Sequence, residues 1–259
     1  MSAGYADPGY PIASVIPGAP PRRLLDLVNQ AQRARDARHS VFHDQTSRAL
    51  NVAVALLGLI LTAPLLIIIA VLVKLTSPGP VIYKQPRVGL DRRRWGSERR
   101  RAGRHGGQLR RGVDQGGRVF TIYKFRTMRS DRDASQVWAC SDDPRITPVG
   151  RILRATRLDE IPQLINVLKG DMNIVGPRPE QPDIFLELSK SVANYRDRQR
   201  VLPGITGLAQ VSMGYDQSLE DVRRKVGFDI KYIRGRSAAT DLAIMAKTMP
   251  VMVFRRGAM

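Results

Sequence analysis

The stretch ALNVAVALLGLILTAPLLIIIAVLV, residues 49–73, decides the kind of fold, because it holds no charged side chain between Arg48 and Lys74. As a helix, its 25 residues would extend over about 37 Å, enough to cross a hydrocarbon core of about 30 Å. A buried core helix rarely stays uncharged over this length. A cleaved signal peptide fits poorly, since 48 residues precede the run. We therefore expect a membrane helix.

Two features leave open whether this helix spans the membrane. Pro64 removes a hydrogen bond in the helix interior and favours a bend, and Asn51 and Thr62 can satisfy backbone groups that a bend releases. Residues 29–48 hold four Arg, and residues 74–93 hold two Lys and three Arg, so the flanks lack the asymmetry of a spanning helix. The residues favour a helix that enters and leaves by one face, with a spanning helix as the alternative.

The composition describes a basic chain that can bury a core. Of its 259 residues 43% are hydrophobic, which excludes global disorder, and the formal charge is +19. The single Cys140 excludes an internal disulfide framework. The charge points to nucleic acid, to an anionic membrane surface or to a phosphate-bearing substrate. The excess of Arg over Lys also fits a bias in the base composition of the coding DNA.

The chain divides into segments around the membrane run. Residues 1–21 are rich in Pro, Gly and Ala, which predicts a disordered tail, and residues 22–45 have the pattern of an amphipathic helix. Residues 46–75 form the membrane helix, and residues 76–259 the main domain. Within that domain residues 91–118 carry ten Arg against three acids. They predict either a solvated loop or one that binds anionic lipid headgroups.

Patterns in the main domain predict a fold that is α+β and mainly helical, with a short β-hairpin and interfacial amphipathic helices. The elements expected are strands at 81–83 and 119–124, a helix from Thr147-Pro148 through Arg157, a second helix with apolar positions at 161, 164, 165 and 168 that ends at Gly170, a helix at 183–201, a loop at 203–207 and an amphipathic helix at 241–253.

A carboxylate pair stands at the junction of the two central helices. Asp159 and Glu160 come just before Pro162, which predicts that they cap the second helix, where the helix dipole favours ionised carboxylates. Arg151, Arg154 and Arg157 approach the pair at a spacing of three and share one helix face.

Further cations accompany this pair in the sequence. Arg178 lies between two prolines, which hold its backbone extended and present a rigid fork of donors suited to a phosphate. Lys124 and Arg126 add positive charge. Two carboxylates among cations beside a membrane suggest phosphoryl transfer, in which the carboxylates hold a divalent metal and one of them attacks phosphorus.

Four blocks now identify a family. They are KLTSPGPVIYKQPRVG at 74–89, FTIYKFRTM at 120–128, DPRITPVGRILRATRLDEIPQLINVLKGDMNIVGPRPE at 143–180 and PGITGLAQV at 203–211. In this order they closely resemble the monotopic phosphoglycosyl transferases, bacterial sugar transferases that begin exopolysaccharide, capsule or O-antigen assembly. The resemblance covers residues 46–259 except the insertion.

The resemblance implies a reaction and its residues. Such enzymes transfer a phospho-sugar from a UDP-sugar to polyprenyl (undecaprenyl) phosphate, release UMP, depend on Mg2+ and form a covalent phosphosugar intermediate. It implies that Asp159 is the nucleophile and that Glu160 binds metal or assists the acceptor step. The cations that would hold the diphosphate or UMP are Lys124, Arg126, Arg154 and Arg178.

The resemblance also implies a location. The membrane helix of the family is re-entrant and broken at Pro64, so a small catalytic domain lies on the cytosolic face of the bacterial inner membrane. This chain has Ala63 before that proline, where the family commonly has Ser, and Leu208 where Trp is common. Anionic lipids are an expected partner, and the helix at 22–43 could mediate a homo-oligomer.

Two other functions compete with this one. The first is a membrane-tethered nucleic-acid binder, but the sequence lacks a helix-turn-helix, RNP-type or zinc pattern, so we do not expect nucleic acid as a partner. The second is an inactive scaffold for glycan assembly, which the intact carboxylate pair disfavours. The sequence does not name the sugar.

Overall fold

The structure, a computed structural model, describes residues 22–91, 116–129, 143–214 and 218–253. The chain forms two compact units, residues 1–44 and residues 45–259. In the first unit the described residues belong to the N-terminal part of helix α1 (Arg22–Thr76). The predicted tail, most of the predicted basic insertion and Cys140 lie outside the described residues.

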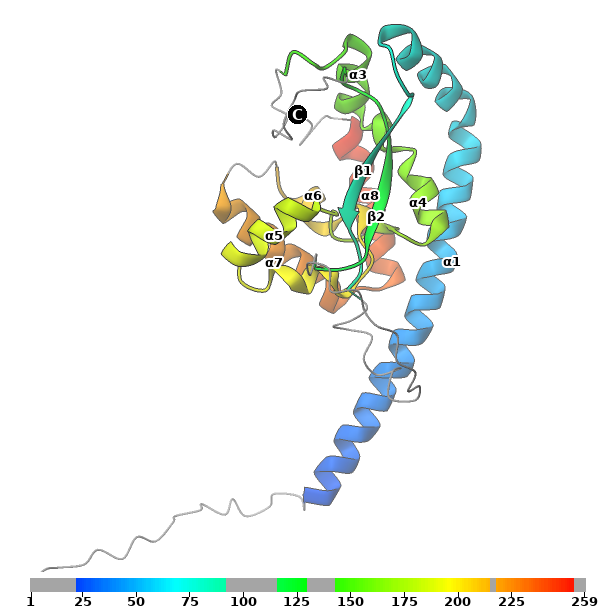
Figure 1. Cartoon of the computed structure of the whole chain (residues 1–259). Helices are drawn as coiled ribbons and strands as arrows, with labels where there is room; N and C mark the ends of the chain where they lie inside the picture. The colour runs from blue at the N-terminus through cyan, green and yellow to red at the C-terminus, as the bar shows by residue number, and fades with distance from the viewer. Residues whose placement is uncertain (1–21, 92–115, 130–142, 215–217, 254–259) are drawn as a thin grey trace, which may run out of the picture. The chain divides into compact units, whose positions relative to one another are not determined.

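Helix α1 contains both the predicted amphipathic segment and the predicted membrane segment without interruption. Pro64 lies inside it, and the helix curves over its cyan C-terminal turns in Figure 1. The segment 45–76 is long and apolar enough to cross a membrane, and only 11% of its most apolar stretch of 18 residues is buried. Ile60 and Leu61 are each 69% exposed. An apolar surface of this extent indicates that the protein associates with a membrane.

The two predicted strands form an antiparallel hairpin. Strand β1 (Ile82–Val88) pairs with strand β2 (Val119–Phe125), and the predicted strand at 81–83 extends further than expected. Pro86 is tolerated in β1 because β2 is its single neighbour in the described sheet. Phe120 and Ile122 point from β2 into the main core.

Helix α3 (Pro148–Thr156) begins where the sequence predicts. The Thr147 hydroxyl accepts a hydrogen bond from the Gly150 amide at 2.9 Å, which caps the helix. We expected from the sequence that this helix would include Arg157, but it ends at Thr156. Arg157 adopts the left-handed conformation, with φ 56°, and so turns the chain away from the helix axis.

The carboxylate pair follows this turn in a single 3-10 turn, η2 (Leu158–Glu160). The prediction that the pair caps the next helix is wrong, because helix α4 (Gln163–Lys169) has Pro162 at its N-cap and no side-chain cap. The carboxylates are therefore left to interact with other elements. The predicted end of α4 is confirmed at Gly170, which adopts φ 80°.

The remaining described elements are β3 (Asn173–Val175), α5 (Pro182–Ser191), η3 (Tyr195–Arg200), β4 (Gly204–Thr206), α6 (Leu208–Ser212), α7 (Leu219–Gly235) and α8 (Ala238–Val253). Strands β3 and β4 pair in parallel, so the prediction of a loop at 203–207 is wrong. The predicted helix at 183–201 is interrupted after α5, where Asn194 adopts φ 58°, and resumes as η3. Helix α8 confirms the predicted helix at 241–253.

Three apolar clusters hold these elements together. The main cluster joins Ala55 of α1 to β2, β3, α4, α7 and α8. A second cluster packs α5 and η3 against α7 around Phe185 and Tyr195, and a third packs Ile69 and Val73 of α1 against Phe125 and Leu153. The mainly helical architecture with few strands and one long apolar helix confirms the coarse part of the predicted fold class. The re-entrant path of that helix and the interfacial position of other helices stay predictions.

Polar contacts fix both ends of the apolar part of α1 to the same unit. Near its start, Arg48 donates to the carbonyls of Val167 and Leu168 at 2.6 and 3.0 Å, at the end of α4. The buried Asn51 accepts a hydrogen bond from the Ile174 amide at 2.5 Å. At its C-terminal end, Arg126 donates to the carbonyls of Val73 and Ser77.

Candidate active site

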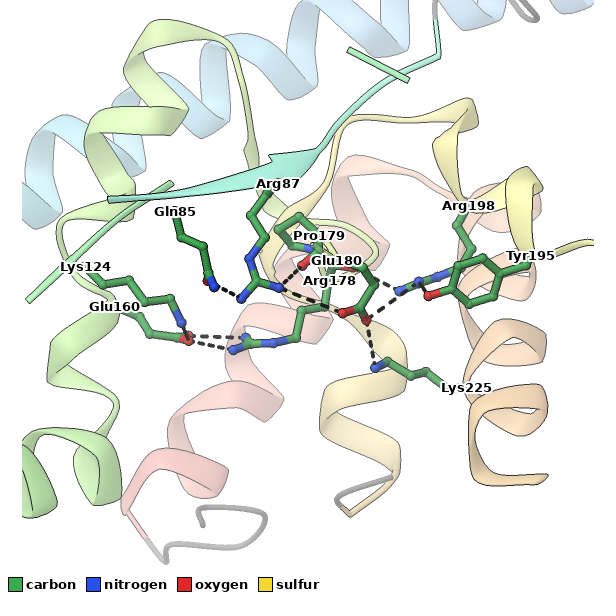
Figure 2. Close-up of polar contacts among 10 residues, drawn as sticks. All are labelled: Gln85, Arg87, Lys124, Glu160, Arg178, Pro179, Glu180, Tyr195, Arg198 and Lys225. Atoms are coloured by element: carbon green, nitrogen blue, oxygen red, sulfur yellow. Dashed lines mark hydrogen bonds and ion pairs between the residues drawn. The ribbon is translucent and has the colours of Figure 1, made fainter. Parts of the chain in front are cut away.

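Glu160 is the most tightly held carboxylate of the candidate site. Its Oε1 lies 2.7 Å from Lys124 Nζ of β2 and 2.7 Å from Arg178 Nη2, and its Oε2 lies 3.4 Å from Arg178 Nη1. These contacts appear at the left of Figure 2. Burial alone would raise the pKa of Glu160, but Arg178 and Lys124 together bring that pKa well below its usual range. Glu160 is therefore ionised at neutral pH.

Asp159 is buried beside Glu160 but is held differently. Within the described part of the chain, its carboxylate accepts no hydrogen bond, although Lys124, Arg178 and Arg154 lie near enough to act on its charge. Burial, and then the charge of Glu160, raise the pKa of Asp159 to about 6. Two neighbouring carboxylates thus have opposite pKa shifts, an arrangement that is common where acids take part in chemistry.

The structure brings together five of the predicted site residues: Asp159, Glu160, Lys124, Arg154 and Arg178. Arg154 reaches this group from α3, where its Nη1 also lies 3.8 Å from the sulfur of Met128. Pro64 lies in the apolar helix, as predicted.

Arg126 has a different environment from the other predicted cations. It is buried, and its Nη2 donates to the carbonyls of Val73 at 3.2 Å and Ser77 at 2.6 Å, where α1 ends. Gly79 adopts φ 112°, and a side chain there would meet Nη1 of Arg126. The contact of Arg126 with phosphate stays a prediction. Its observed contacts join the residue after β2 to the C-terminal end of α1.

A second group of buried charges was missed from the sequence; we call it the Glu180 cluster, made of Arg87, Glu180, Tyr195, Arg198, Lys225 and Asp229, of which Figure 2 draws all but Asp229. Glu180 lies 3.3 Å from Lys225, 3.8 Å from Arg198 and 3.9 Å from Arg87. Burial would raise the pKa of Glu180, but Lys225, Arg198 and Arg87 lower it to about 2.

One sequence signal could have revealed this cluster. Asp229 follows Val222 and Val226 on the buried face of α7, so an acid stands where the helical period calls for an apolar residue. A buried acid requires a paired cation, and Asp229 accepts a hydrogen bond from Arg198 Nε at 2.7 Å. Finding the partner requires the fold, because Arg198 comes from η3.

A family model described as bacterial sugar transferase matches residues 42–105 and 106–255. The chain belongs to the bacterial sugar transferase family. The resemblance inferred from the sequence blocks is thereby confirmed at the level of the family.

Curated relatives of this sugar transferase carry related names. It is 39% identical, over 81% of its length, to the UDP-glucose:undecaprenyl-phosphate glucose-1-phosphate transferase of Caulobacter vibrioides, of which the match covers 70%. It is 38% identical, over 82% of its length, to the UDP-N-acetylgalactosamine-undecaprenyl-phosphate N-acetylgalactosaminephosphotransferase of Aeromonas hydrophila, of which the match covers 44%. It is 36% identical to exopolysaccharide production protein ExoY of Sinorhizobium fredii, over 82% of its own length and 87% of that protein.

These relatives differ in length and in the sugars that their names state. The chain spans less than half of the Aeromonas protein and most of the other two. One name states glucose and another N-acetylgalactosamine. Membership of the sugar transferase family therefore does not identify the sugar.

Proposed function

We propose that this protein transfers a sugar phosphate from a UDP-sugar to undecaprenyl phosphate, giving undecaprenyl diphosphate-sugar and UMP. The names of the relatives support this donor and this acceptor. The observation that carries the proposal is the asymmetric carboxylate pair: Glu160 is held by two cations, whereas its buried neighbour Asp159 accepts no hydrogen bond from the described residues. A carboxylate left in this state among cations suits nucleophilic attack on a phosphate.

The proposed reaction has two displacements at phosphorus. An oxygen of Asp159 forms a bond to the β-phosphorus of the donor while the bond from that phosphorus to the UMP oxygen breaks, and UMP leaves. A phosphate oxygen of the acceptor then attacks the same phosphorus, and the bond to Asp159 breaks, which restores the carboxylate. With its pKa raised to about 6, most of the Asp159 carboxyl is ionised at pH 7, so the attack requires no general base.

The surrounding cations supply the electrostatic part of catalysis. Negative charge on the transferred phosphate must be neutralised in the transition state. In this proposal, Arg178 and Lys124 are held in place by Glu160 and face the donor diphosphate, and Arg154 acts on it from α3. Glu160 thus orients cations and does not itself attack.

The carboxylate pair also fits Mg2+, which we propose as cofactor. Within the described residues no group of three or more His, Cys, Asp or Glu side chains could hold a metal ion. Mg2+ is commonly held by one or two carboxylates together with substrate phosphates, and Asp159 and Glu160 supply that number. When bound, the ion would neutralise charge on the diphosphate oxygens.

We further propose that the apolar part of α1 is re-entrant. Its start is bonded to α4 and β3 through Arg48 and Asn51, and its end is bonded to Arg126, the residue after β2. A spanning helix would carry one of these ends to the opposite membrane face, away from the unit that holds both. In this arrangement, the catalytic unit lies on the cytosolic face of the inner membrane, where soluble donor and lipid acceptor meet.

A donor panel tests the proposed reaction. The purified full chain in nanodiscs is given UDP-sugars, undecaprenyl phosphate and Mg2+, and UMP release is measured. With donor alone, the intact protein should gain the mass of one sugar phosphate, and Asp159→Asn should lose both the mass gain and the turnover. Asp183→Asn, which changes an exposed acid of α5, is the matched control. Turnover retained in Asp159→Asn would refute the assigned nucleophile.

A further inference from the structure

The backbone that carries Arg178 is held at four consecutive carbonyl groups. Pro177 O accepts from the Gly204 amide of β4 at 3.0 Å, and Glu180 O accepts from the Val88 amide of β1 at 2.9 Å. Between them, Pro179 O accepts from Arg87 Nη1 at 3.1 Å and Arg178 O accepts from Arg198 Nη2 at 3.0 Å. Three elements therefore fix one short segment, and side chains hold its two central carbonyls.

Arg198 uses each of its three nitrogens for a different partner. Nε donates to Asp229 of α7 at 2.7 Å, Nη1 donates to the Tyr195 hydroxyl at 2.8 Å, and Nη2 donates to Arg178 O. Arg198 and Asp229 are 3% and 2% exposed, so water does not compete for these contacts. The guanidinium is thus locked in orientation from two sides, and its third side points at the backbone of Arg178.

We propose that Arg198, anchored by Asp229, is a positioning residue for the Arg178 side chain. The inference rests on the proposed function, in which Arg178 holds the donor diphosphate. Prolines on both sides restrict the backbone of Arg178. A hydrogen bond to the carbonyl of Arg178 therefore fixes the position of its Cα, from which the side chain extends. Displacing this Cα moves the guanidinium relative to Glu160, with which it makes contacts at 2.7 and 3.4 Å.

Arg198→Lys is the variant that isolates this role. An ammonium can keep the ion pair with Asp229, but it lacks the planar fork that reaches Tyr195 and Arg178 O at the same time. We expect UMP release to fall by about 10-fold to 100-fold, chiefly in kcat, because the misplaced Arg178 loses contact with charge that develops in the transition state. The UMP burst without acceptor counts the active enzyme, so that misfolded protein does not enter the rate.

The double variant separates positioning from simple support of the fold. If Arg198 acts through the Arg178 side chain, Arg198→Lys should change the rate of Arg178→Ala by no more than about twofold. A purely structural role predicts that the two losses multiply. Val226→Ala, which opens a cavity in the second core cluster, controls for lost stability, and Arg223→Lys on the exposed face of α7 controls for the substitution itself.

Hydrogen exchange gives a second readout that does not depend on activity. In Arg198→Lys, the amides of Gly204 and Val88, which donate to the held segment, should exchange faster than in Arg223→Lys. If the wild type shows no turnover with any UDP-sugar, the proposed function fails, and hydrogen exchange still tests whether Arg198 holds the backbone of Arg178; equal exchange in Arg198→Lys and Arg223→Lys would then overturn the positioning role. If the wild type turns over while Arg198→Lys matches it in both rate and exchange, the positioning role is overturned and the function stands.

Discussion

Two groups of buried charges lie on either side of Arg178, and they differ in how fully their carboxylates are paired. On one side Glu160, next to Asp159, pairs with Lys124 and Arg178, and on the other side Glu180 and Asp229 pair with the remaining cations of the Glu180 cluster. Figure 2 draws the contacts of Glu160 and Glu180. In the Glu180 cluster each carboxylate has a cation within ion-pair distance. In the first group, Asp159 accepts no hydrogen bond from the described residues.

The pKa shifts of one carboxylate from each group, Asp159 and Glu180, illustrate this difference, whereas burial raises the pKa of Asp229 even though Arg198 pairs with it. Burial and the charge of Glu160 raise the pKa of Asp159 to about 6, whereas three cations overcome burial and lower that of Glu180 to about 2. Ionised Asp159 therefore costs folding free energy at pH 7, and ionised Glu180 stabilises the fold. A saturated cluster makes a rigid support, and an unsaturated carboxylate beside it is suited to react.

The largest expected effect comes from Asp159→Asn. Loss of the nucleophile should lower UMP release by at least about a thousandfold. The same change should leave the unfolding temperature equal or higher, because the amide removes a buried charge that accepts no hydrogen bond from the described residues. Paired measurements of turnover and thermal unfolding check this. An unfolding temperature several degrees lower would mean that the Asp159 carboxylate supports the fold, and the contrast between the two groups would fail.

In contrast to Asp159→Asn, the variant Asp229→Ala should lower the stability of the fold. It removes the carboxylate that accepts the hydrogen bond from Arg198 Nε and leaves the buried guanidinium with the longer 3.8 Å contact to Glu180. Breaking a buried ion pair in this way typically lowers the free energy of unfolding by about 3–5 kcal/mol. Denaturant unfolding in detergent micelles measures this loss. Glu187→Ala, an exposed acid on α5, is the control and should stay close to the wild type. A similar stability for both variants would contradict the structural role of the cluster.

The sequence predicted the carboxylate pair and its cations better than it predicted their geometry. Thr147, Pro148 and Gly170 are local signals, and each marks the helix boundary that the structure has. The end of α3 was misplaced, because the left-handed conformation of Arg157 leaves no local mark in an arginine. The error changed the interpretation of Asp159 and Glu160 from helix caps to partners of distant cations.

The support behind Arg178 could not be predicted in the same way. The Glu180 cluster joins residues of β1, η3 and α7, which are far apart in the sequence and individually look like surface charges. Strand β4 was taken for a loop, because three residues in a Pro- and Gly-rich stretch carry no strand period. Only long-range pairing with β3 makes them a strand.

Acid should weaken the Glu180 cluster at a defined pH. The pKa of Glu180 in the folded state, about 2, lies below its ordinary value of 4.5, so its stabilisation is fully present above pH 4.5 and is lost as the pH falls towards 2. The loss amounts to about 3 kcal/mol. Unfolding temperatures of the wild type should fall over this range more steeply than those of Glu180→Gln. Parallel curves would show that the cluster does not hold Glu180 ionised.

The smallest effect belongs to an ion pair outside both groups. Arg223 Nη1 lies 3.2 Å from Glu220 on the surface of α7, a distance close to the 2.7 Å of the Arg198–Asp229 pair. The side chains of Arg223 and Glu220, however, are 54% and 68% exposed. Water already solvates such charges, so Arg223→Ala should change the free energy of unfolding by less than about 1 kcal/mol and leave UMP release unchanged. Denaturant unfolding at low and high salt checks this. A loss as large as that of Asp229→Ala would mean that distance, and not burial, sets the strength of ion pairs in this protein, and the distinction between a buried support and a solvated surface would have no energetic basis.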